Sequence, residues 1–505
     1  MIFVRRKHTP FAGGAKVCSG IDARGNHELF GRNGCGPVPF LHVAAAHPGH
    51  GVRFSREALR FTETNPWRQQ KERYGAPRAG RISADTITLR VAAAGWHTRS
   101  HSVSGQLKFE WEECMHKSVD HILTTHTGSL PRGAELNDLL IADEAGEKVD
   151  QAKLVEKIDK RVAHVMEKQR WAGVDVANDG EQGRVGFQTY VPKRMHGFGG
   201  ESKRPFGREW IENPLFTEKF SARIPKTGKV FGCPECVGEL KYHDKEAIKT
   251  ELARFKKAAA AIRPPFPEMF FAEPSPGIIA TTMLNAHYAT YEAYLDAIAR
   301  EMHYEYKSVV DAGYVLQIDA PDLAMERVLL FQDKTEAEYV KIVELHIATL
   351  NKALHDIPRD RVRLHICWGN WEGPHIYDIG LEPLLQAFYQ ANVGALSIEF
   401  ANARRQHEYA AVKKQKFPDN MILIPGVIDS KINLVEHPEV VAQRIEAAVA
   451  AVGDRERVIA GVDCGFGTFA GWEWVAEDVV WLKLKTLREG ADIASKRLWG
   501  KKAAA

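Results

Sequence analysis

A histidine and a cysteine lie two residues apart in the apolar stretch RLHICWGN, at positions 365 and 367. In a β-strand, residues i and i+2 point to the same face of the sheet, so a strand here would present an imidazole and a thiol side by side. Zn²⁺ takes nitrogen, sulfur and oxygen ligands in tetrahedral geometry. A single pair of this kind carries little information, so the question is whether other parts of the chain supply further ligands.

Eight short apolar runs alternate with long amphipathic segments from about residue 119 onward, as in repeated strand–helix units. They are residues 121–129, 173–181, 268–276, 314–322, 362–370, 395–402, 421–429 and 458–467. Eight strands with alternating helices predict an α/β protein, a (β/α)8 TIM barrel. Because residues 182–267 are too long for one strand–helix connection, we expect an insertion after strand two, with a hairpin or helical excursion over the barrel mouth.

Polar residues end each run, and the active sites of TIM barrels lie at the carboxyl ends of the strands. Glu399 ends the sixth run and Cys464 lies near the end of the eighth. With His365 and Cys367 they make a credible Zn²⁺ ligand set. The alternative is that both cysteines are buried core residues and Glu399 is an ion-pair partner. The collection of all four at neighbouring strand ends favours the metal, because core positions rarely gather histidine and glutamate.

These strand ends resemble the catalytic barrel of the cobalamin-independent methionine synthases, and more closely their short single-barrel relatives. The resemblance covers roughly residues 119–480. It rests on the motifs HTGSLPR, NDGEQGR, QIDAPDLAM, LHICWGN, SIEFAN, IPGVID and GVDCGFGT. It implies a zinc-dependent S-methyltransferase of methionine biosynthesis, which transfers a methyl group to a zinc-bound thiol such as homocysteine.

The resemblance also implies roles for individual residues. The zinc ligands correspond to His365, Cys367, Glu399 and Cys464. The residues that hold the amino acid thiol correspond to Gly128, Ser129, Glu181 and Asp319. The two carboxylates among them could instead pair with Arg132, Arg184 or another cation at the mouth.

Other residues near the predicted mouth have two interpretations each. His126, at the end of strand one, is either a substrate contact or an ordinary surface histidine. Trp368, Trp371 and His375 follow strand five, where they either wall the pocket or only pack. Asp463, directly before Cys464, either orients a neighbour or makes a structural hydrogen bond.

Lys431 marks a departure from the family pattern, because the true synthases carry a histidine there, proposed to help deliver a proton to the folate leaving group. A lysine with an ordinary pKa of about 10.4 is a poor proton relay at neutral pH. As a fixed cation it suits a carboxylate, a sulfonate or a developing alkoxide. We predict catalytic roles for Lys431, Asp429 and Glu181, and weak or absent methyl transfer from methyltetrahydrofolate triglutamate.

Two further functions remain open. One is alkylation of a thiol by a different electrophile, as in the epoxyalkane:coenzyme M transferases among the short relatives. The other is a non-catalytic barrel that binds zinc or a small thiol. In each case the expected partners are small molecules, a thiol and for the enzymes an alkyl donor, and the oligomeric state is open, with a homo-oligomer among the alternatives.

Composition bounds these hypotheses. The chain has 505 residues, a net charge of +3 and seven cysteines, so it is no disulfide framework, and we expect a reducing cytoplasm. No apolar stretch is long enough to cross a membrane. Residues 1–114 hold 17 Lys and Arg against 9 Asp and Glu, and are rich in glycine and arginine without helical or strand periodicity.

We therefore expect residues 1–114 to be an arm with little packed structure, which does not bind nucleic acid, and residues 115–505 to form the barrel. Met115 is a plausible true start. A lone CxxC at Cys233 and Cys236 could be half a zinc ribbon or a redox pair, but no second CxxC follows it.

Overall fold

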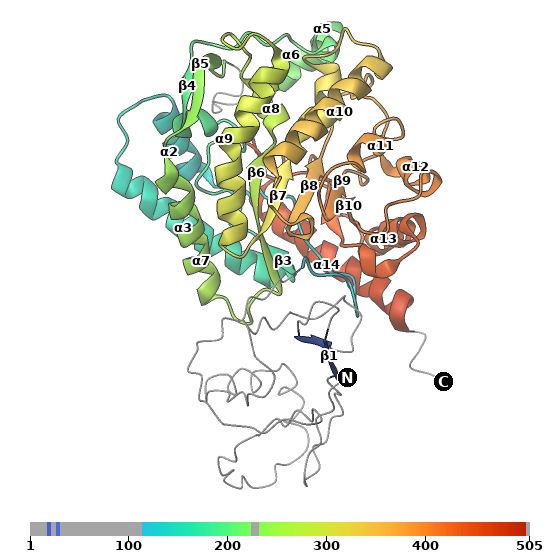
Figure 1. Ribbon diagram of the computed structural model, residues 1–505. Coiled ribbons are helices and arrows are strands. Elements are labelled where there is room, and N and C mark those ends of the chain that lie inside the picture. The colour runs from blue at the N-terminus through green and yellow to red at the C-terminus, as the bar shows by residue number, and fades with distance from the viewer. Residues whose placement is uncertain (1–17, 22–26, 31–113, 224–231, 501–505) are drawn as a thin grey trace, which may run out of the picture. The chain divides into compact units, whose positions relative to one another are not determined.

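The computed structural model describes residues 18–21, 27–30, 114–223 and 232–500 (Figure 1). The chain divides into two units, Met1–Glu113 and Cys114–Ala505. In the first unit the described residues form β1 (Cys18–Ile21) and β2 (His27–Phe30), which pair antiparallel. The rest of the predicted arm lies outside the described residues, so its character stays a prediction.

The second unit is an α/β barrel whose strands follow one another around the sheet in the order β11-β10-β9-β8-β7-β6-β3, all parallel. The strands are β3 (Val176–Ala177), β6 (Glu268–Pro274), β7 (Val315–Asp319), β8 (Val362–Ile366), β9 (Ala395–Ile398), β10 (Ile422–Ile428) and β11 (Gly461–Val462). Each lies within one of the predicted runs, which confirms the predicted fold class.

The first predicted run joins the two edges of this sheet. It forms only two isolated parallel bridges, Thr124 with Ala460 and Thr125 with Val176, and not a continuous strand. The pairing is short because the chain leaves the sheet at once: the backbone N–H of Gly128 donates to Nδ1 of His126, 3.2 Å away. The sequence therefore predicts the position of this element correctly and its length too generously.

Helices surround the strands (Figure 1). The long ones are α2 (Ala134–Glu144), α3 (Gln151–Ala172), α7 (Lys245–Ala261), α9 (Tyr291–Asp311), α10 (Glu336–Ala353), α13 (Pro438–Val452) and α14 (Glu477–Trp499). The short ones are α8 (Pro276–Thr282), α11 (Leu385–Phe388) and α12 (Tyr409–Lys414). None of the described helices is long and apolar enough to cross a membrane.

The helix α10 shows how the sequence specifies these elements. Thr335 and Glu338 form a capping box, which satisfies two backbone N–H groups at the helix start. Tyr339, Val343 and Leu350 follow at helical spacing and are buried, so one face of the helix packs on the barrel.

The insertion after β3 contains both predicted features. An antiparallel hairpin forms from β4 (Met195–Gly199) and β5 (Glu235–Tyr242), and the short helices are α4 (Val191–Arg194), α5 (Arg208–Glu212) and α6 (Pro214–Arg223). Buried ion pairs connect its start to the barrel: Arg184 lies 3.0 Å from Glu273 at the end of β6, and Arg194 lies 2.9 Å from Glu305 of α9.

The barrel interior changes character along its axis. Its lower part is apolar, filled by Leu123, Val176, Phe270, Val315, Ala395, Ile422, Ile424 and Ile459. Above it lies Arg363, whose guanidinium stacks 3.4 Å from the Phe270 ring centre and donates to Gln317, Thr125 and the carbonyl of His126. This buried cation ties strands β7 and β8 to the first run, directly below the polar residues of the site.

Candidate active site

A cavity of about 430 Å³ opens at the carboxyl ends of the strands. Its floor includes Ser129, Glu181, Asp319, His365, Cys367 and Cys464. Its walls include Phe187, Phe206, Trp210, Trp371, Phe469 and Trp472. The sequence therefore predicts correctly that residues far apart in the chain meet at one mouth.

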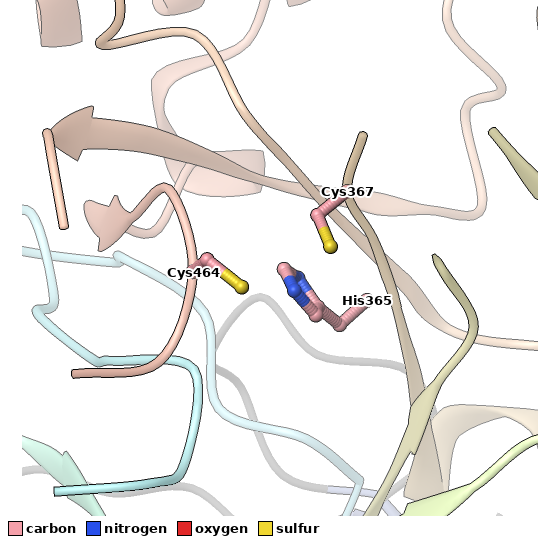
Figure 2. A group of neighbouring side chains, drawn as sticks. All are labelled: His365, Cys367 and Cys464. Carbon is pink, nitrogen blue, oxygen red and sulfur yellow. The ribbon is translucent and has the colours of Figure 1, made fainter. Parts of the chain in front are cut away.

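Three predicted metal ligands meet on the floor. His365 lies in β8, Cys367 follows that strand directly, and Cys464 approaches from the loop after β11 (Figure 2). One ligand atom from each lies within 4.8 Å of the others, and all three residues are buried.

The environment of these side chains fits a soft cation. Among the described residues, neither ring nitrogen of His365 has a hydrogen-bond partner of normal geometry. Burial, followed by the charge of Arg363, lowers the pKa of His365 to about 3, so the ring is neutral and offers a lone pair. The contact with Cys367, followed by burial, raises the pKa of Cys464. Two buried thiols beside an unpartnered imidazole are a donor set that Zn²⁺ satisfies.

Glu399, the fourth predicted ligand, does not join this group. Its carboxylate lies 3.2 Å from Nζ of Lys431 and accepts a hydrogen bond from Nδ2 of Asn402 at 3.0 Å. Burial alone would lower the pKa of Lys431, but the charges of Glu399 and then Asp463 outweigh it, and the pKa is raised. Lys431 is therefore a fixed cation in this state, while a ligand role for Glu399 remains a prediction.

Two aspartates shape the loops that carry this ion pair. Asp463 accepts the backbone N–H groups of Phe400, Ala401 and Asn402 at 2.8–2.9 Å, which fixes the turn after β9. Asp429 accepts the backbone N–H of Lys431 at 2.8 Å. Asp429 does not line the cavity, so its place in the structure is at the base of the Lys431 loop.

Glu181 and Asp319 form a pair of carboxyl groups at the cavity. Burial raises the pKa of Glu181 to about 7, and burial together with the charge of Glu181 raises the pKa of Asp319. Oε2 of Glu181 has no hydrogen-bond partner among the residues described. Two carboxyl groups that face a cavity with an unsatisfied oxygen suit the ammonium group of a substrate.

The rival interpretation, that arginines neutralise these carboxyls, does not match the contacts. Arg132 donates to the backbone carbonyls of Gly467 and Glu181, not to the Glu181 side chain. Arg184 pairs with Glu251 and Glu273 instead. No salt bridge within the described ranges joins either arginine to Glu181 or Asp319.

The loop after the first run places Ser129 at the cavity and Gly128 directly before it, against Glu181. Gly128 has φ of 139°, and a Cβ there would lie 2.5 Å from Oε1 of Glu181, so only glycine fits. Ser129 lines the cavity. His126 does not: it is buried, with Nδ1 bonded to the Gly128 N–H and Nε2 2.7 Å from Oε1 of Gln169. Its place is to hold the loop, and substrate contact by His126 has no support in this geometry.

Of the three residues after strand five, one lines the cavity and two pack within the protein. Trp371 lines the cavity. Trp368 is buried, donates to the carbonyl of Ile379 and stacks on Arg405, so it packs. His375 bonds Asp378 and likewise lies away from the cavity.

Several residues of the site escaped the sequence reasoning. Arg363 and Gln317 support the floor from below, and Trp210 and Trp472 wall the mouth. The charged Arg363 inside the apolar run VRLHIC is a signal that could have been used, since a central strand rarely buries an arginine without a purpose. The CxxC cysteines are both buried, and Cys233 lies in the cavity wall.

Comparisons with known proteins agree with this architecture. Residues 279–485 match the family model described as the catalytic domain of cobalamin-independent synthase. The uncharacterized protein YxjH of Bacillus subtilis is 27% identical over 379 residues, 71% of this chain and 91% of that protein. A methionine synthase of Sulfolobus acidocaldarius is 23% identical over 354 residues, 70% of this chain and 87% of that protein.

Two further comparisons concern a lyase and a solved structure. The 2-hydroxypropyl-CoM lyase of Xanthobacter autotrophicus is 23% identical over 383 residues, 70% of this chain and 89% of that protein. The structure of a B12-independent methionine synthase from Shewanella sp. W3-18-1 superposes with a TM-score of 0.57 at 21% identity, over 75% of this chain and 99% of that chain, which shows a shared fold. Residues 279–485 therefore match the catalytic domain of the cobalamin-independent synthases, and the barrel as a whole shares the fold of a B12-independent methionine synthase.

Proposed function

We propose that this protein is a zinc-dependent S-methyltransferase that transfers a methyl group to the thiol of a small amino acid such as homocysteine. The observation that carries the proposal is the group of His365, Cys367 and Cys464, within ligand distance of one another on a floor that also holds Glu181 and Asp319. An N/S donor set beside two carboxyl groups suits a ligand with both a thiol and an ammonium group.

Zn²⁺ held by His365, Cys367 and Cys464 would deprotonate a bound thiol, which is mostly protonated and weakly nucleophilic when free at neutral pH. The chain's own residues do the rest. Glu181 and Asp319 bind and orient the ammonium group, and Ser129 lies at the same edge of the cavity. The aromatic walls exclude water, so the thiolate sulfur meets the methyl donor in an apolar space.

A Zn²⁺ ion held by His365, Cys367 and Cys464 would have room for a further ligand such as the thiol. We propose that Glu399 would be this ligand in the absence of thiol, and that Lys431 compensates its charge when the two pair at 3.2 Å, as they do here. The Glu399→Gln variant tests this role. It should retain zinc, because the other three ligands remain, but it should bind zinc more weakly without thiol than with it.

The kind of alkyl donor that we expect follows from the charge of Lys431. Since its pKa is raised, it cannot deliver a proton to a folate leaving group at neutral pH as a histidine could, but it stabilises a developing anion. We therefore expect a donor smaller than methyltetrahydrofolate triglutamate, for example a methylated cofactor or a methylthio compound. The same cation would favour the second candidate, in which the thiolate opens an epoxide, provided that Lys431, which pairs with Glu399 and does not line the cavity here, turns to the new alkoxide.

The decisive experiment is a matrix of thiols against alkyl donors, with products identified by mass spectrometry and zinc measured on the same preparation. The thiols are homocysteine, cysteine and coenzyme M; the donors are methyltetrahydrofolate, its triglutamate, methylcobalamin, S-methylmethionine and propylene oxide. We expect methylated homocysteine with one of the non-folate methyl donors. A zinc-replete protein that alkylates none of the thiols would contradict the proposal and favour a binding protein.

The Lys431→His variant sharpens the assignment of the donor. It should gain methyl transfer from methyltetrahydrofolate triglutamate if the proton is what the wild type lacks. Turnover of that folate by the wild type at about 1 s⁻¹ or faster, a rate ordinary for enzymes, would refute the donor argument and restore ordinary methionine synthesis.

A further inference from the structure

A second group of metal-ligating side chains lies away from the cavity. It consists of His303 of α9 with His355 and Asp356, which follow the end of α10. One ligand atom from each lies within 4.8 Å of the others. The two imidazole rings lie 4.5 Å apart, centre to centre, and Nε2 of His303 is 3.5 Å from the Asp356 carboxylate.

Hydrogen bonds fix the tautomers of both histidines in the form that binds metal. Nδ1 of His303 lies 2.8 Å from the carbonyl of Ala353, and Nδ1 of His355 lies 3.1 Å from the carbonyl of Lys352. A carbonyl oxygen only accepts, so both Nδ1 atoms carry the hydrogen. In the neutral rings, each Nε2 atom then carries a lone pair that is available to a metal. This backbone-anchored arrangement is the usual one for metal-binding histidines.

A simple ion pair explains less of this geometry. Protonated His303 would pair with Asp356, but His355 would then gain nothing from lying against a cationic ring. Two nitrogen donors and a carboxylate in reach of one point suit a transition-metal ion such as Zn²⁺ or Ni²⁺.

The position of the group indicates a structural role. The helix α10 leads to the amino end of β8, so its last residues lie at the end of the barrel opposite the cavity, the end associated with stability and not catalysis. Lys352 and Asp296, 2.6 Å apart, already join α10 to α9 beside the group. Asp356 is 48% exposed at its side chain, so an ion could enter from solvent.

We propose that His303, His355 and Asp356 bind one divalent transition-metal ion, which clips the end of α10 to α9 and stabilises the barrel. The ion takes Nε2 from each histidine and an oxygen from Asp356, and completes its shell with water. This site is independent of the floor of the cavity and of the reaction performed there.

The test compares zinc binding by full-length protein with that of the His303→Gln/His355→Gln variant. Glutamine retains an N–H donor for the backbone carbonyls but offers no imidazole, so the fold should survive. The matched control is His196→Gln/His243→Gln, because these two rings also stack, 4.1 Å apart, but belong to no candidate ligand group among the described residues. Each protein is titrated with Zn²⁺ by calorimetry, and its Tm is measured with and without the metal.

We expect two zinc equivalents in the wild type and the control, and loss of the weaker one in the His303→Gln/His355→Gln variant. Asp356→Asn should weaken that equivalent by about 10- to 100-fold, the range for lost metal-site interactions. Zinc in excess should raise the Tm of wild type and control by a few degrees, but not that of the variant.

Two results would overturn the inference. One is unchanged zinc stoichiometry and affinity in the His303→Gln/His355→Gln variant. The other is a second equivalent that disappears equally in the His196→Gln/His243→Gln control. The Cys367→Ser/Cys464→Ser variant separates the two sites, because it should retain the weaker equivalent and its Tm shift even though the equivalent of the cavity floor is lost.

Discussion

The floor and the mouth of the cavity are built by different means. Floor residues are positioned by the parallel ladder, whose register places Asp319 of β7 beside His365 of β8. Mouth residues come from the insertion and from two loops: Trp210, Trp371 and Phe220 pack on one another with ring centres 5.5–5.7 Å apart. The sheet's backbone hydrogen bonds therefore support the floor, whereas the mouth combines aromatic packing with short loop contacts, such as the bridge between Phe469 and Trp472.

This difference shows how barrels of one architecture can keep the same thiol chemistry and use different alkyl donors. The ladder fixes His365 within β8, and Cys367 and Cys464 follow directly on the ends of β8 and β11, so the floor can keep one chemistry, activation of a thiol. Aromatic side chains on loops can be exchanged without disturbing the strands. We infer that the floor determines the thiol chemistry and the mouth determines the alkyl donor.

The largest effect is expected at the proposed metal ligands of the cavity floor. Cys367→Ser or Cys464→Ser should remove the zinc equivalent of the floor and lower activity by about 10³-fold or more, as for other groups that act directly in the chemistry. Circular dichroism and Tm should stay close to wild type, because barrel stability lies in the apolar core layers. Metal content and product formation are measured on the same samples. Two zinc equivalents in the Cys367→Ser/Cys464→Ser double variant would rule out the floor as a zinc site.

The carboxyl pair should show a large, pH-dependent effect on binding. Because the pKa of Glu181 is raised to about 7, its carboxylate forms as the pH rises through 7, and affinity for an ammonium group should rise with it. Methionine is the ligand of choice, since its thioether has no proton to lose. Glu181→Gln should weaken methionine binding by about 10- to 100-fold at pH 8, and less at pH 6.

The same shift predicts the pH dependence of stability. An acid with a pKa above its unfolded value binds more protons when folded, so the free protein should lose stability as the pH rises from about 4.5 to about 7. Glu181→Gln should flatten this part of the profile in denaturant titrations. An unchanged profile together with unchanged methionine affinity would refute the assignment of Glu181.

A moderate effect, confined to the donor, is expected at the mouth. Trp371→Ala should raise the KM for the alkyl donor by about 3- to 10-fold, the scale of one aromatic contact, with the thiol KM unchanged. Trp474→Ala is the matched control, because Trp474 packs on Phe220 in the same aromatic cluster but does not line the cavity. A Trp371→Ala variant that changes both KM values equally would break the distinction between floor and mouth.

The smallest effect is expected from removal of residues 1–114. A chain that begins at Met115 should bind zinc and methylate like the full chain. It retains the buried Met115 side chain and its N–H bond to the carbonyl of Asp360, 3.1 Å away. A chain that begins at Asp120 should have a lower Tm, because it also loses Ser118, whose hydroxyl bonds Val458 at 2.6 Å. Lost activity in the chain that begins at Met115 would show that residues 1–114 contribute to the function of the barrel.

The sequence by itself determined the barrel and the convergence of His365, Cys367 and Cys464, the candidate metal ligands. Hydrophobic periodicity predicts which residues face a core, and the strand ends of a barrel converge on one mouth. The sequence therefore predicts that His365, Cys367 and Cys464 lie close together. The length of residues 182–267 similarly required an insertion. None of these inferences needed a side-chain conformation.

Only the tertiary structure decided the charge partners and the orientations. Glu399 could bind metal or a cation, and the structure pairs it with Lys431; His126 could face the cavity or the protein, and the structure turns it to Gln169. The walls from Trp210 and Trp472 depend on how the insertion folds over the loops. Such choices depend on contacts between segments that are far apart in the chain. The alternative partners lie within a few ångströms of the side chain and bind it with comparable energies. A local sequence pattern fixes the type of a side chain and its face, but not its partner.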